Sequence, residues 1–433
     1  MRYYSLNDST HTASFAEATI EGQGMDKGLY FPQTIPFFHK GFFQDITQYT
    51  REEIAFMVLH PYAKDDLPDE ELTRIVSETI NFPTPLVQVS NDIFCLELFH
   101  GPTQAFKDVG ARFMSRCLGY FVRNNNKEVT VLVATSGDTG GAVANGFYGV
   151  EGVNVIILYP SGKVSPVQEL QLTTLGGNIT ALEVAGNFDD CQALVKQAFS
   201  DNQLKEHLFL TSANSINVAR WLPQQVYYFL AWQQWPYKSK PPVVSVPSGN
   251  FGNICAGLLA FKSGLPVRQF IAACNANDVV PHYLANGQYN PQKAIATLSN
   301  AMDVGDPSNL VRIRQLFENN LESLRSSVLA ESITDRETLS TIEHVYKQHH
   351  YTLDPHGAVG YTALAHYLEN VEDQKGYFLE TAHPIKFYET IEPAIGSSID
   401  KSIVHSLLTK KKTSIKISPD YTQLKDFLLA NAL

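Results

Sequence analysis

The sequence predicts an α/β fold in which parallel sheets are flanked by helices. Short apolar segments typical of buried strands alternate along most of the chain with segments whose apolar residues recur at helical spacing. Two apolar segments, VTVLVA (129–134) and VVSVP (243–247), run directly into glycine-containing loops that open a helix. Strands that alternate with helices favour parallel sheets covered on both faces.

The length of the chain indicates more than one domain. A single hydrophobic core rarely extends over 433 residues, so at least two domains are expected. The first 90 residues are mixed in pattern and carry many Pro and Phe residues, and the α/β alternation begins only after them. We therefore predict an N-terminal subdomain (1–90), a small α/β domain (91–202) and a large α/β domain (203–433).

Each predicted element follows from its local pattern. Apolar runs with the composition of buried strands lie at 93–99, 129–134, 153–159, 179–185, 243–247, 270–274 and 376–381. Helical spacing occurs near 51–59 and 68–79, from 106 and from 140, at 165–176, 188–199, 217–235, 251–264, 308–329, 336–349 and 357–370, and after Pro384. Thr103 is available as the N-cap of the helix from Phe106.

Composition and charge exclude several classes of protein. The formal net charge is −11, so nucleic acid, which is held by clustered basic residues, is not the expected partner. Proline and glycine interrupt the long uncharged segment 241–261, which excludes a membrane span. The five cysteines lack metal-site spacing, and the N-terminus lacks the pattern of a signal peptide. We expect a cytoplasmic monomer or homodimer that acts on a small molecule and binds neither a membrane nor a metal.

Two glycine loops are candidate anion sites. ATSGDTGGA (134–142) and PSGNFGNICAG (247–257) each follow a strand and open a helix, where free N–H groups and the helix dipole favour negative charge. Neither loop has the G-x-x-x-x-G-K-S/T pattern of a P-loop or the G-x-G-x-x-G pattern of a dinucleotide site. A tight turn explains one such loop equally well, but two together favour a bound anion other than ATP or NAD.

The segment HGPTQAFKDVG (100–110) places Lys107 at the beginning of a predicted helix. The helix dipole disfavours a permanent positive charge there, and burial further lowers the pKa of an amine. A lysine that acts as a nucleophile must lose its proton, so this position suits a reactive amine. The alternative is a surface lysine paired with Asp108.

Six motifs together carry a resemblance to a known family. They are, in chain order, HGPTQAFKDVGARFM, ATSGDTGGA, TSANSINVARWLPQ, PSGNFGNICAG, DPHGAVG and TAHPIKF, and SFAEATIEGQGMDKGLYFPQTIP precedes them. This series resembles threonine synthase of the bacterial and fungal long form over nearly the whole chain. The resemblance implies pyridoxal 5′-phosphate (PLP) as cofactor. It also implies fold type II, shared with tryptophan synthase β, with two open, twisted, mainly parallel sheets.

The resemblance also implies roles for individual residues. Lys107 matches the lysine that forms a Schiff base with PLP, and Thr381 matches the hydroxyl residue at the pyridine nitrogen. The cradle for the cofactor phosphate is matched by the backbone N–H groups of Gly249, Asn250, Phe251, Gly252 and Asn253. The substrate carboxylate is matched by Ser136 and Thr139, and the substrate phosphate by Asn214, Ser215 and Arg220. Asp138 stands near the cofactor's 3′-oxygen, where some relatives carry asparagine, and an acid donates a hydrogen bond there only when protonated.

The implied reaction is the last step of threonine biosynthesis, catalysed by a carbon–oxygen lyase acting on phosphates. O-phospho-L-homoserine loses phosphate by γ-elimination, and water adds at Cβ to give L-threonine. Lys107 is expected to move protons at Cα and Cβ, and Arg220 to hold the departing phosphate. Two alternatives stay open: a PLP-dependent phospho-lyase acting on O-phosphothreonine or O-phosphoserine, and an inactive anion-binding relative. The intact NSINVAR segment favours the synthase, and retention of Lys107 argues against the inactive protein.

Overall fold

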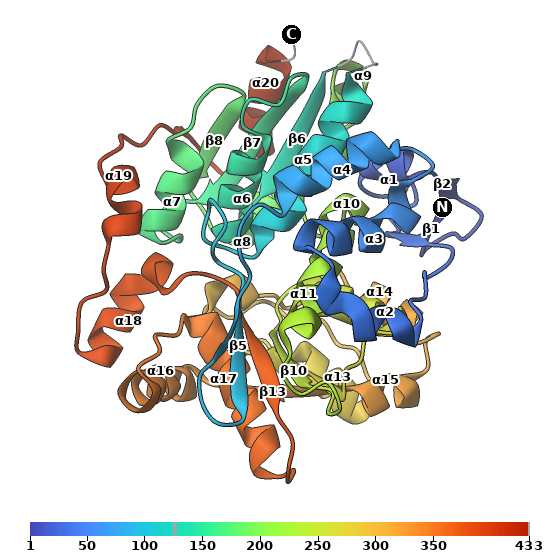
Figure 1. Cartoon of the computed structure of the whole chain (residues 1–433). Helices are drawn as coiled ribbons and strands as arrows, with labels where there is room; N and C mark the ends of the chain where they lie inside the picture. Colours follow the sequence, from blue (N-terminus) through green and yellow to red (C-terminus); the bar gives the residue numbers. More distant parts are fainter. Residues whose placement is uncertain (124–127, 432–433) are drawn as a thin grey trace.

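Three sheets organise the computed structural model, which describes residues 1–123 and 128–431 (Figure 1). Two of them are large and mainly parallel, and the six-stranded sheet lies below the five-stranded one in the view of Figure 1. This arrangement confirms the predicted α/β class. Within the described ranges, no helix is long and apolar enough to cross a membrane.

The five-stranded sheet is parallel throughout. Its strands, in spatial order, are β14 (Ile415–Ile417), β8 (Ile179–Val184), β7 (Val153–Pro160), β6 (Val129–Ala134) and β9 (Phe209–Thr211). Alternate residues of β6 face opposite cores, since Val131 packs in one apolar cluster and Leu132 in another. The surrounding helices are α5 (Lys107–Val122), α6 (Asp138–Phe147), α7 (Pro166–Thr173), α8 (Phe188–Ser200), α9 (Asn202–His207) and α20 (Tyr421–Ala430).

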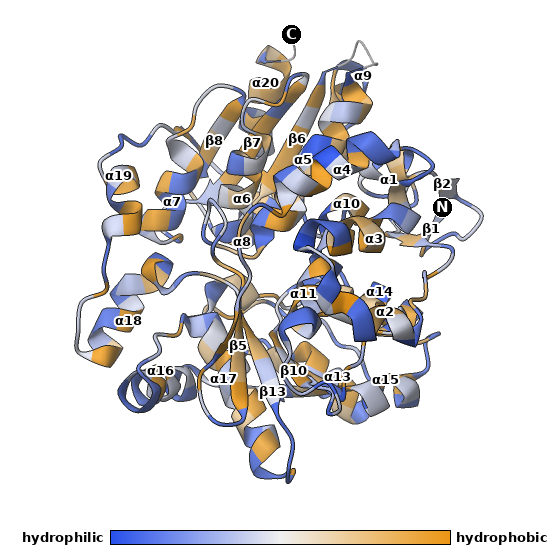
Figure 2. Ribbon diagram, viewed as in Figure 1, coloured by the Kyte–Doolittle hydropathy of each residue, from blue (hydrophilic) through white to orange (hydrophobic). Residues whose placement is uncertain are grey.

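The six-stranded sheet is parallel except at one edge, where β4 pairs antiparallel to β5. Its order is β12 (Val328–Ser332), β11 (Gln269–Cys274), β10 (Val243–Pro247), β13 (Gly376–Glu380), β5 (Ile93–Glu97) and β4 (Leu86–Gln88). The helices around it are α11 (Gln225–Gln234), α12 (Gly252–Lys262), α13 (Val279–Asn286), α14 (Leu310–Leu316), α15 (Leu321–Ser327), α16 (Asp335–His349) and α17 (Pro355–Glu369). Figure 2 shows apolar colours along β5 and β6 and polar colours on outer helices such as α4.

The N-terminal segment forms a small antiparallel sheet and four helices. The strands are β2 (Thr12–Ala13), β1 (Tyr3–Ser5) and β3 (Tyr30–Pro32). The helices are α1 (Phe15–Glu21), α2 (Lys40–Asp45), α3 (Arg51–Ala63) and α4 (Asp69–Thr79). They pack on α5 and α11, so this segment covers the helices that connect the two large sheets.

The chain passes between the two large sheets more than once. β5, near residue 95, belongs to the six-stranded sheet, whereas β9 and β14, near residues 210 and 416, belong to the five-stranded one. The sheets therefore do not follow the predicted boundaries at residues 90 and 202. Because α5 follows β5, Lys107 lies where the chain passes from one sheet to the other.

Three predicted helices are differently built. The helix over 217–235 is divided at Pro223 into α10 (Val218–Trp221), a 3-10 turn η2 (Leu222–Gln224) and α11, because proline removes a backbone donor. The helix over 308–329 is divided into α14 and α15 because Glu318 and Asn319 adopt left-handed φ angles of 53° and 58°. After Pro384 the chain forms η4 (Pro384–Phe387) before α18 (Tyr388–Ile395), and α19 (His405–Leu408) follows.

Candidate active site

The turn that carries Lys107 is fixed against the end of β13. The Phe106 N–H donates to the Thr381 carbonyl at 2.9 Å, and the His383 N–H donates to the Gln104 carbonyl at 3.0 Å. Gln104 adopts a left-handed φ of 55°, a conformation uncommon outside glycine. These contacts bring Lys107 and Thr381 together, although they are far apart in the sequence.

Lys107 is partly buried and is not paired with Asp108. The Asp108 carboxylate instead accepts from the Thr103 N–H at 2.9 Å and from the Thr103 hydroxyl at 2.6 Å. The alternative of a surface ion pair is therefore wrong, and so is the prediction that Thr103 caps α5, since the helix has no side-chain N-cap. Burial lowers the pKa of Lys107 to about 8, so about one-tenth of the amine is neutral at pH 7.

The loop over residues 248–253 fits a phosphate group. β10 ends at Pro247 and α12 begins at Gly252, with Phe251 at a left-handed φ of 60°. In the described part of the chain, the backbone N–H groups of residues 249–253 have no hydrogen-bond acceptor, although this stretch is largely buried. Unpaired neighbouring donors at a helix N-terminus form an anion site.

Close packing holds this loop in place. A Cβ atom at Gly249 would lie 2.6 Å from the Cα of Met302 and 2.9 Å from the carbonyl oxygen of Ala301. Asn250 accepts from the Ser308 N–H at 2.7 Å and donates to the Ser215 hydroxyl at 2.8 Å. The loop is therefore preorganised by contacts with residues far along the chain.

The first glycine loop is shaped by Thr135, a residue that the sequence did not single out. The Thr135 hydroxyl accepts from the N–H groups of Gly137 at 3.0 Å and Gly140 at 2.8 Å. The hydroxyls of Ser136 and Thr139 have no partner among the described residues, and both side chains are partly exposed. These two hydroxyls are available to bind a small anion.

Asp138 is a buried anion paired with Lys386. The Lys386 Nζ lies 2.6 Å from the Asp138 Oδ1, and the Gln168 amide donates to the same oxygen at 2.9 Å. Burial alone would raise the pKa of Asp138, but the ammonium groups of Lys386 and Lys107 hold it below its usual range. Asp138 is therefore ionised and accepts hydrogen bonds without donating any, which resolves what its sequence position left open.

The segment between β9 and α11 supplies a second cationic group. Arg220 is almost fully buried, and its Nη1 donates to the Ala213 carbonyl, while its Nε has no acceptor among the residues described. Burial lowers the pKa of Arg220 to about 10, which still leaves the guanidinium charged at neutral pH.

The Ser215 hydroxyl accepts from the amides of Asn250 at 2.8 Å and Asn309 at 3.2 Å, so its own hydrogen can be donated elsewhere. The Asn214 side chain is partly exposed on the same segment.

Behind Thr381 lies a pair of buried carboxyl groups. The Asp354 N–H donates to the Glu380 Oε1 at 2.6 Å, and among the described residues one oxygen of each carboxyl has no hydrogen-bond donor. Burial, followed by the negative charge of Asp354, raises the pKa of Glu380 well above its usual value. This environment favours the protonated form of Glu380.

His356 connects this carboxyl pair to the phosphate loop. Its Nε2 accepts from the Ala301 N–H at 3.2 Å, so the ring proton is on Nδ1, which donates to the Asp354 Oδ1. Ala301 in turn packs against Gly249. The histidine thus positions the backbone that supports the loop.

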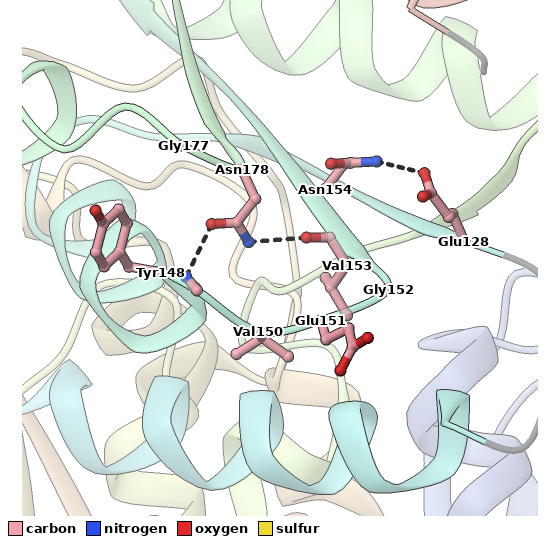
Figure 3. A pocket seen from close by; sticks show the side chains of 10 residues that line it. Glu128, Tyr148, Val150, Glu151, Gly152, Val153, Asn154, Gly177 and Asn178 are labelled. Atoms are coloured by element: carbon pink, nitrogen blue, oxygen red, sulfur yellow. Dashed lines mark hydrogen bonds between the residues drawn. The ribbon is translucent and has the colours of Figure 1, made fainter.

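Of two hollows on the described part of the chain, only one borders a residue of the candidate site. A cleft of about 270 Å³ is bordered by Lys386 and by segments from both large sheets, namely 162–166, 297–300 and 387–390. A larger hollow of about 370 Å³ lies at the loops around β7 and contains no predicted site residue (Figure 3). Its polar groups already bond to one another, as Asn154 to Glu128 and Asn178 to the Val153 carbonyl.

Sequence reasoning missed Lys386, Thr135 and the Glu380–Asp354 pair. Lys386 and the Glu380–Asp354 pair have partners that are distant in the chain, and side-chain pairing across the fold leaves no local pattern. Thr135 contacts its own loop, but one threonine in a glycine loop does not indicate that role. Lys386 did carry one signal, because it is a charged residue inside the otherwise apolar segment PIKF.

The partly neutral amine of Lys107 suits an aldehyde, and the N–H groups of residues 249–253, which have no acceptor among the described residues, suit a phosphate. PLP carries both groups. The family described as "Pyridoxal-phosphate dependent enzyme" matches residues 78–378. The families described as "Threonine synthase N terminus" and "Threonine synthase, C-terminal" match residues 2–80 and 357–428. The cofactor predicted from the sequence is thereby confirmed.

Individual relatives cover almost the whole chain. The threonine synthase of Escherichia coli K12 is 47% identical over 92% of both chains, and that of Saccharomyces cerevisiae is 35% identical over 99% of this chain and 96% of its own. The crystal structure of the Escherichia coli enzyme superposes with a TM-score of 0.93 over 99% of this chain, at 43% identity. The PLP-bound threonine synthase of Brucella melitensis gives a TM-score of 0.93 over 100% of this chain, at 33% identity. This chain belongs to the threonine synthase family.

Proposed function

We propose that this protein converts O-phospho-L-homoserine and water into L-threonine and phosphate in the cytoplasm. The observation that carries the proposal is a pair of separate anion sites near one reactive amine. The unpaired N–H groups of residues 249–253 suit the phosphate of PLP. Arg220 is buried, and its positive charge acts on the Lys107 amine. Its guanidinium suits a second phosphate group, which a phosphorylated substrate would carry.

Three parts of the chain would hold the cofactor. Lys107 would bind its aldehyde carbon, residues 249–253 its phosphate, and the Thr381 hydroxyl its pyridine nitrogen. When bound, PLP withdraws electrons from the bonds at the substrate Cα and makes the protons there acidic. Asp138 would accept hydrogen bonds near the ring, and Lys386 keeps it ionised.

The substrate would be held at both of its ends. Ser136 and Thr139 would donate their free hydroxyls to its carboxylate, and Asn214, Ser215 and Arg220 would bind its phosphate. A guanidinium suits the departing phosphate because it can form two parallel charge-assisted hydrogen bonds. Binding at both ends orients Cα and Cβ toward the Lys107 amine.

Lys107 would move the protons. Its Nζ would take one proton from the substrate Cα and one from Cβ. It would deliver one to Cγ, which becomes the methyl group of threonine when the phosphate has left, and one back to Cα, while water supplies the hydroxyl at Cβ. A base is most efficient when its pKa is close to the working pH, and the value of about 8 for Lys107 meets this condition. The phosphate leaves from Cγ with both electrons of the Cγ–O bond.

The substrate assignment is tested by comparing phosphate release from three compounds. We expect O-phospho-L-homoserine to be turned over at least about a hundredfold faster than O-phospho-L-threonine or O-phospho-L-serine, since a transition state bound at both ends discriminates by more than about 2.7 kcal/mol. The product from the first compound should be L-threonine. Faster release from either of the other two compounds would replace the proposal with a PLP-dependent phospho-lyase.

The division into functional domains is also a proposal. We assign the carboxylate-binding loop to a small domain built on the five-stranded sheet and the phosphate cradle to a large domain built on the six-stranded sheet. Whether one chain or two form the working unit is tested by its sedimentation, for which a monomer or a homodimer is expected.

A further inference from the structure

Lys386 is a buried cation for which the reaction described above has no assigned step. Its side chain is 0% exposed, and its Nζ lies 2.6 Å from the Asp138 Oδ1 and donates to the Thr103 carbonyl at 2.9 Å. A buried ammonium is stable only when it is paired and hydrogen-bonded. The chain therefore maintains this charge with two dedicated partners.

The partners of Lys386 flank the reactive lysine. Thr103 belongs to the turn that leads into Lys107, and Asp138 is the first residue of α6 in the first glycine loop. Lys386 itself lies five positions after Thr381, in η4. The ammonium of Lys386 thus contacts both segments that surround the Lys107 amine.

The charged groups that act on the Lys107 amine come from three elements. Asp138 on α6 favours its protonated form, whereas Lys386 on η4 and Arg220 on α10 disfavour it. Asp138 is thus the anion that could trap Lys107 as an ammonium, and a protonated lysine cannot attack an aldehyde. An ion pair with Lys386 occupies that same carboxylate.

We propose that Lys386 is a positioning residue that keeps Lys107 in its nucleophilic form by pairing with Asp138 and repelling a proton from the Lys107 amine. The inference rests on the proposed role of Lys107. If Lys386 had only a structural role, its ion pair with Asp138 would hold η4 and α6 together. Loss of that ion pair would lower the folding stability without changing the pH at which Lys107 reacts.

The test measures how fast PLP attaches to Lys107 as a function of pH. PLP is added to the PLP-free protein at pH values from about 6 to about 10, and attachment is followed by absorbance and located by borohydride reduction and peptide mass spectrometry. For Lys386→Met we expect the midpoint of the pH profile to rise by about one pH unit or more, because an unpaired carboxylate raises the pKa of a neighbouring amine by that amount. For Asp138→Asn we expect the midpoint to fall.

Further variants keep the test decisive. Lys386→Arg retains the charge and should keep the midpoint of the wild type. Lys386→Met combined with Asp138→Asn removes both charges, and its midpoint should return from the elevated value of the single variant. The matched control is Lys401→Met, which removes an ion pair with Glu392 at 3.2 Å on the partly exposed surface and should leave the profile unchanged.

The outcomes separate this inference from the proposed function. An unmoved midpoint in folded Lys386→Met, with or without a lower melting temperature, would overturn the inference alone. If Lys386→Met does not fold, Asp138→Asn decides, because an unchanged midpoint in that variant would equally overturn it. Wild-type protein that attaches no PLP at Lys107 would overturn the proposed function and this inference with it.

Discussion

Lys107 shows how a single residue acquires reactivity from its surroundings. The amine is placed at the start of α5, near the cations Lys386 and Arg220, and burial contributes most to the lowering of its pKa. The two cations that lower this pKa come from α10 and η4, and Asp138 on α6 opposes them. The sequence indicated the lysine from its local motif but could not indicate Lys386, because that pairing exists only in the folded chain.

The variant Gly249→Ala tests the phosphate cradle by adding a single methyl group to the loop. In Gly249→Ala the new Cβ would lie 2.6 Å from the Cα of Met302, so backbone must shift and the N–H groups of the loop lose their alignment. Overpacking of this kind costs about 1–3 kcal/mol, and we expect PLP to bind at least about fivefold more weakly. Titration of the PLP-free protein with PLP measures this, and Gly41→Ala, where a Cβ meets nothing within 4 Å, is the control. Equal affinity in both variants would show that the loop does not hold the cofactor phosphate.

Arg220 tests the substrate phosphate site. For Arg220→Gln we expect kcat/KM for O-phospho-L-homoserine to fall at least about tenfold, because a charge-assisted phosphate contact is worth about 1.5–3 kcal/mol. Attachment of PLP to Lys107 should persist, which distinguishes substrate binding from cofactor binding. Arg325→Gln, on a surface helix with an ion pair to Glu322, serves as the control. Unchanged kinetics in Arg220→Gln would remove Arg220 from the site.

At the scale of elements, a buried acid joins β13 to α17. Glu380 at the end of β13 accepts a hydrogen bond from the N–H of Asp354, the N-cap residue of α17, and His356 extends the connection to Ala301. These contacts stabilise the positions of Thr381 and of the phosphate loop. The members of this network are too far apart in sequence to be recognised as a group before folding.

The raised pKa of Glu380 predicts a pH dependence of the stability of the fold. Its folded-state pKa is raised, chiefly by burial and by the charges of Asp354 and Glu97. Its contribution is therefore complete below the ordinary carboxyl value of 4.5 and is lost as the pH rises through the raised value. Glu380→Gln, which keeps the shape and one donor, should remove this part of the loss at alkaline pH. Denaturant unfolding at several pH values tests this against Glu343→Gln, an exposed control, and an identical pH slope in wild type and Glu380→Gln would contradict it.

The elements themselves were predicted well where the local pattern was strong. β6, β7, β8, β10 and β11 were located within a residue or two by their apolar runs. The short edge strands β9, β12 and β14 were not predicted, because edge strands of three to five residues carry little pattern of their own. The division of two long helices at Pro223 and at Glu318–Asn319 required backbone conformations that helical spacing alone does not reveal.

At the scale of the whole molecule, the C-terminus returns to the first α/β block. β14 adds an edge strand beside β8, and α20 packs on α8, as the red α20 beside the green strands of Figure 1 shows. Leu424 and Leu428 of α20 share an apolar cluster with Leu194. The sequence order did not predict this return, since nothing local marks which sheet the last strand joins.

The variant Leu424→Ala tests whether the C-terminal helix stabilises the five-stranded sheet. Leu424→Ala empties a fully buried position and should lower the free energy of unfolding by about 2–5 kcal/mol. Hydrogen exchange should become faster in β8 and α8 than in β10 and β11, because the cavity lies on the five-stranded sheet. Leu408→Ala, at a position 37% exposed, is the control. Uniform acceleration across both sheets would contradict a local role for the C-terminal helix.

The most direct measurement is the product balance of the purified protein with O-phospho-L-homoserine, with Lys107→Ala alongside. We expect one L-threonine for each phosphate released by the wild type and neither product above background from the variant. The variant should remain folded, because the Lys107 side chain is only partly buried. Phosphate without threonine, or equal turnover by the Lys107→Ala protein, would show that the chain is not a threonine synthase that uses Lys107.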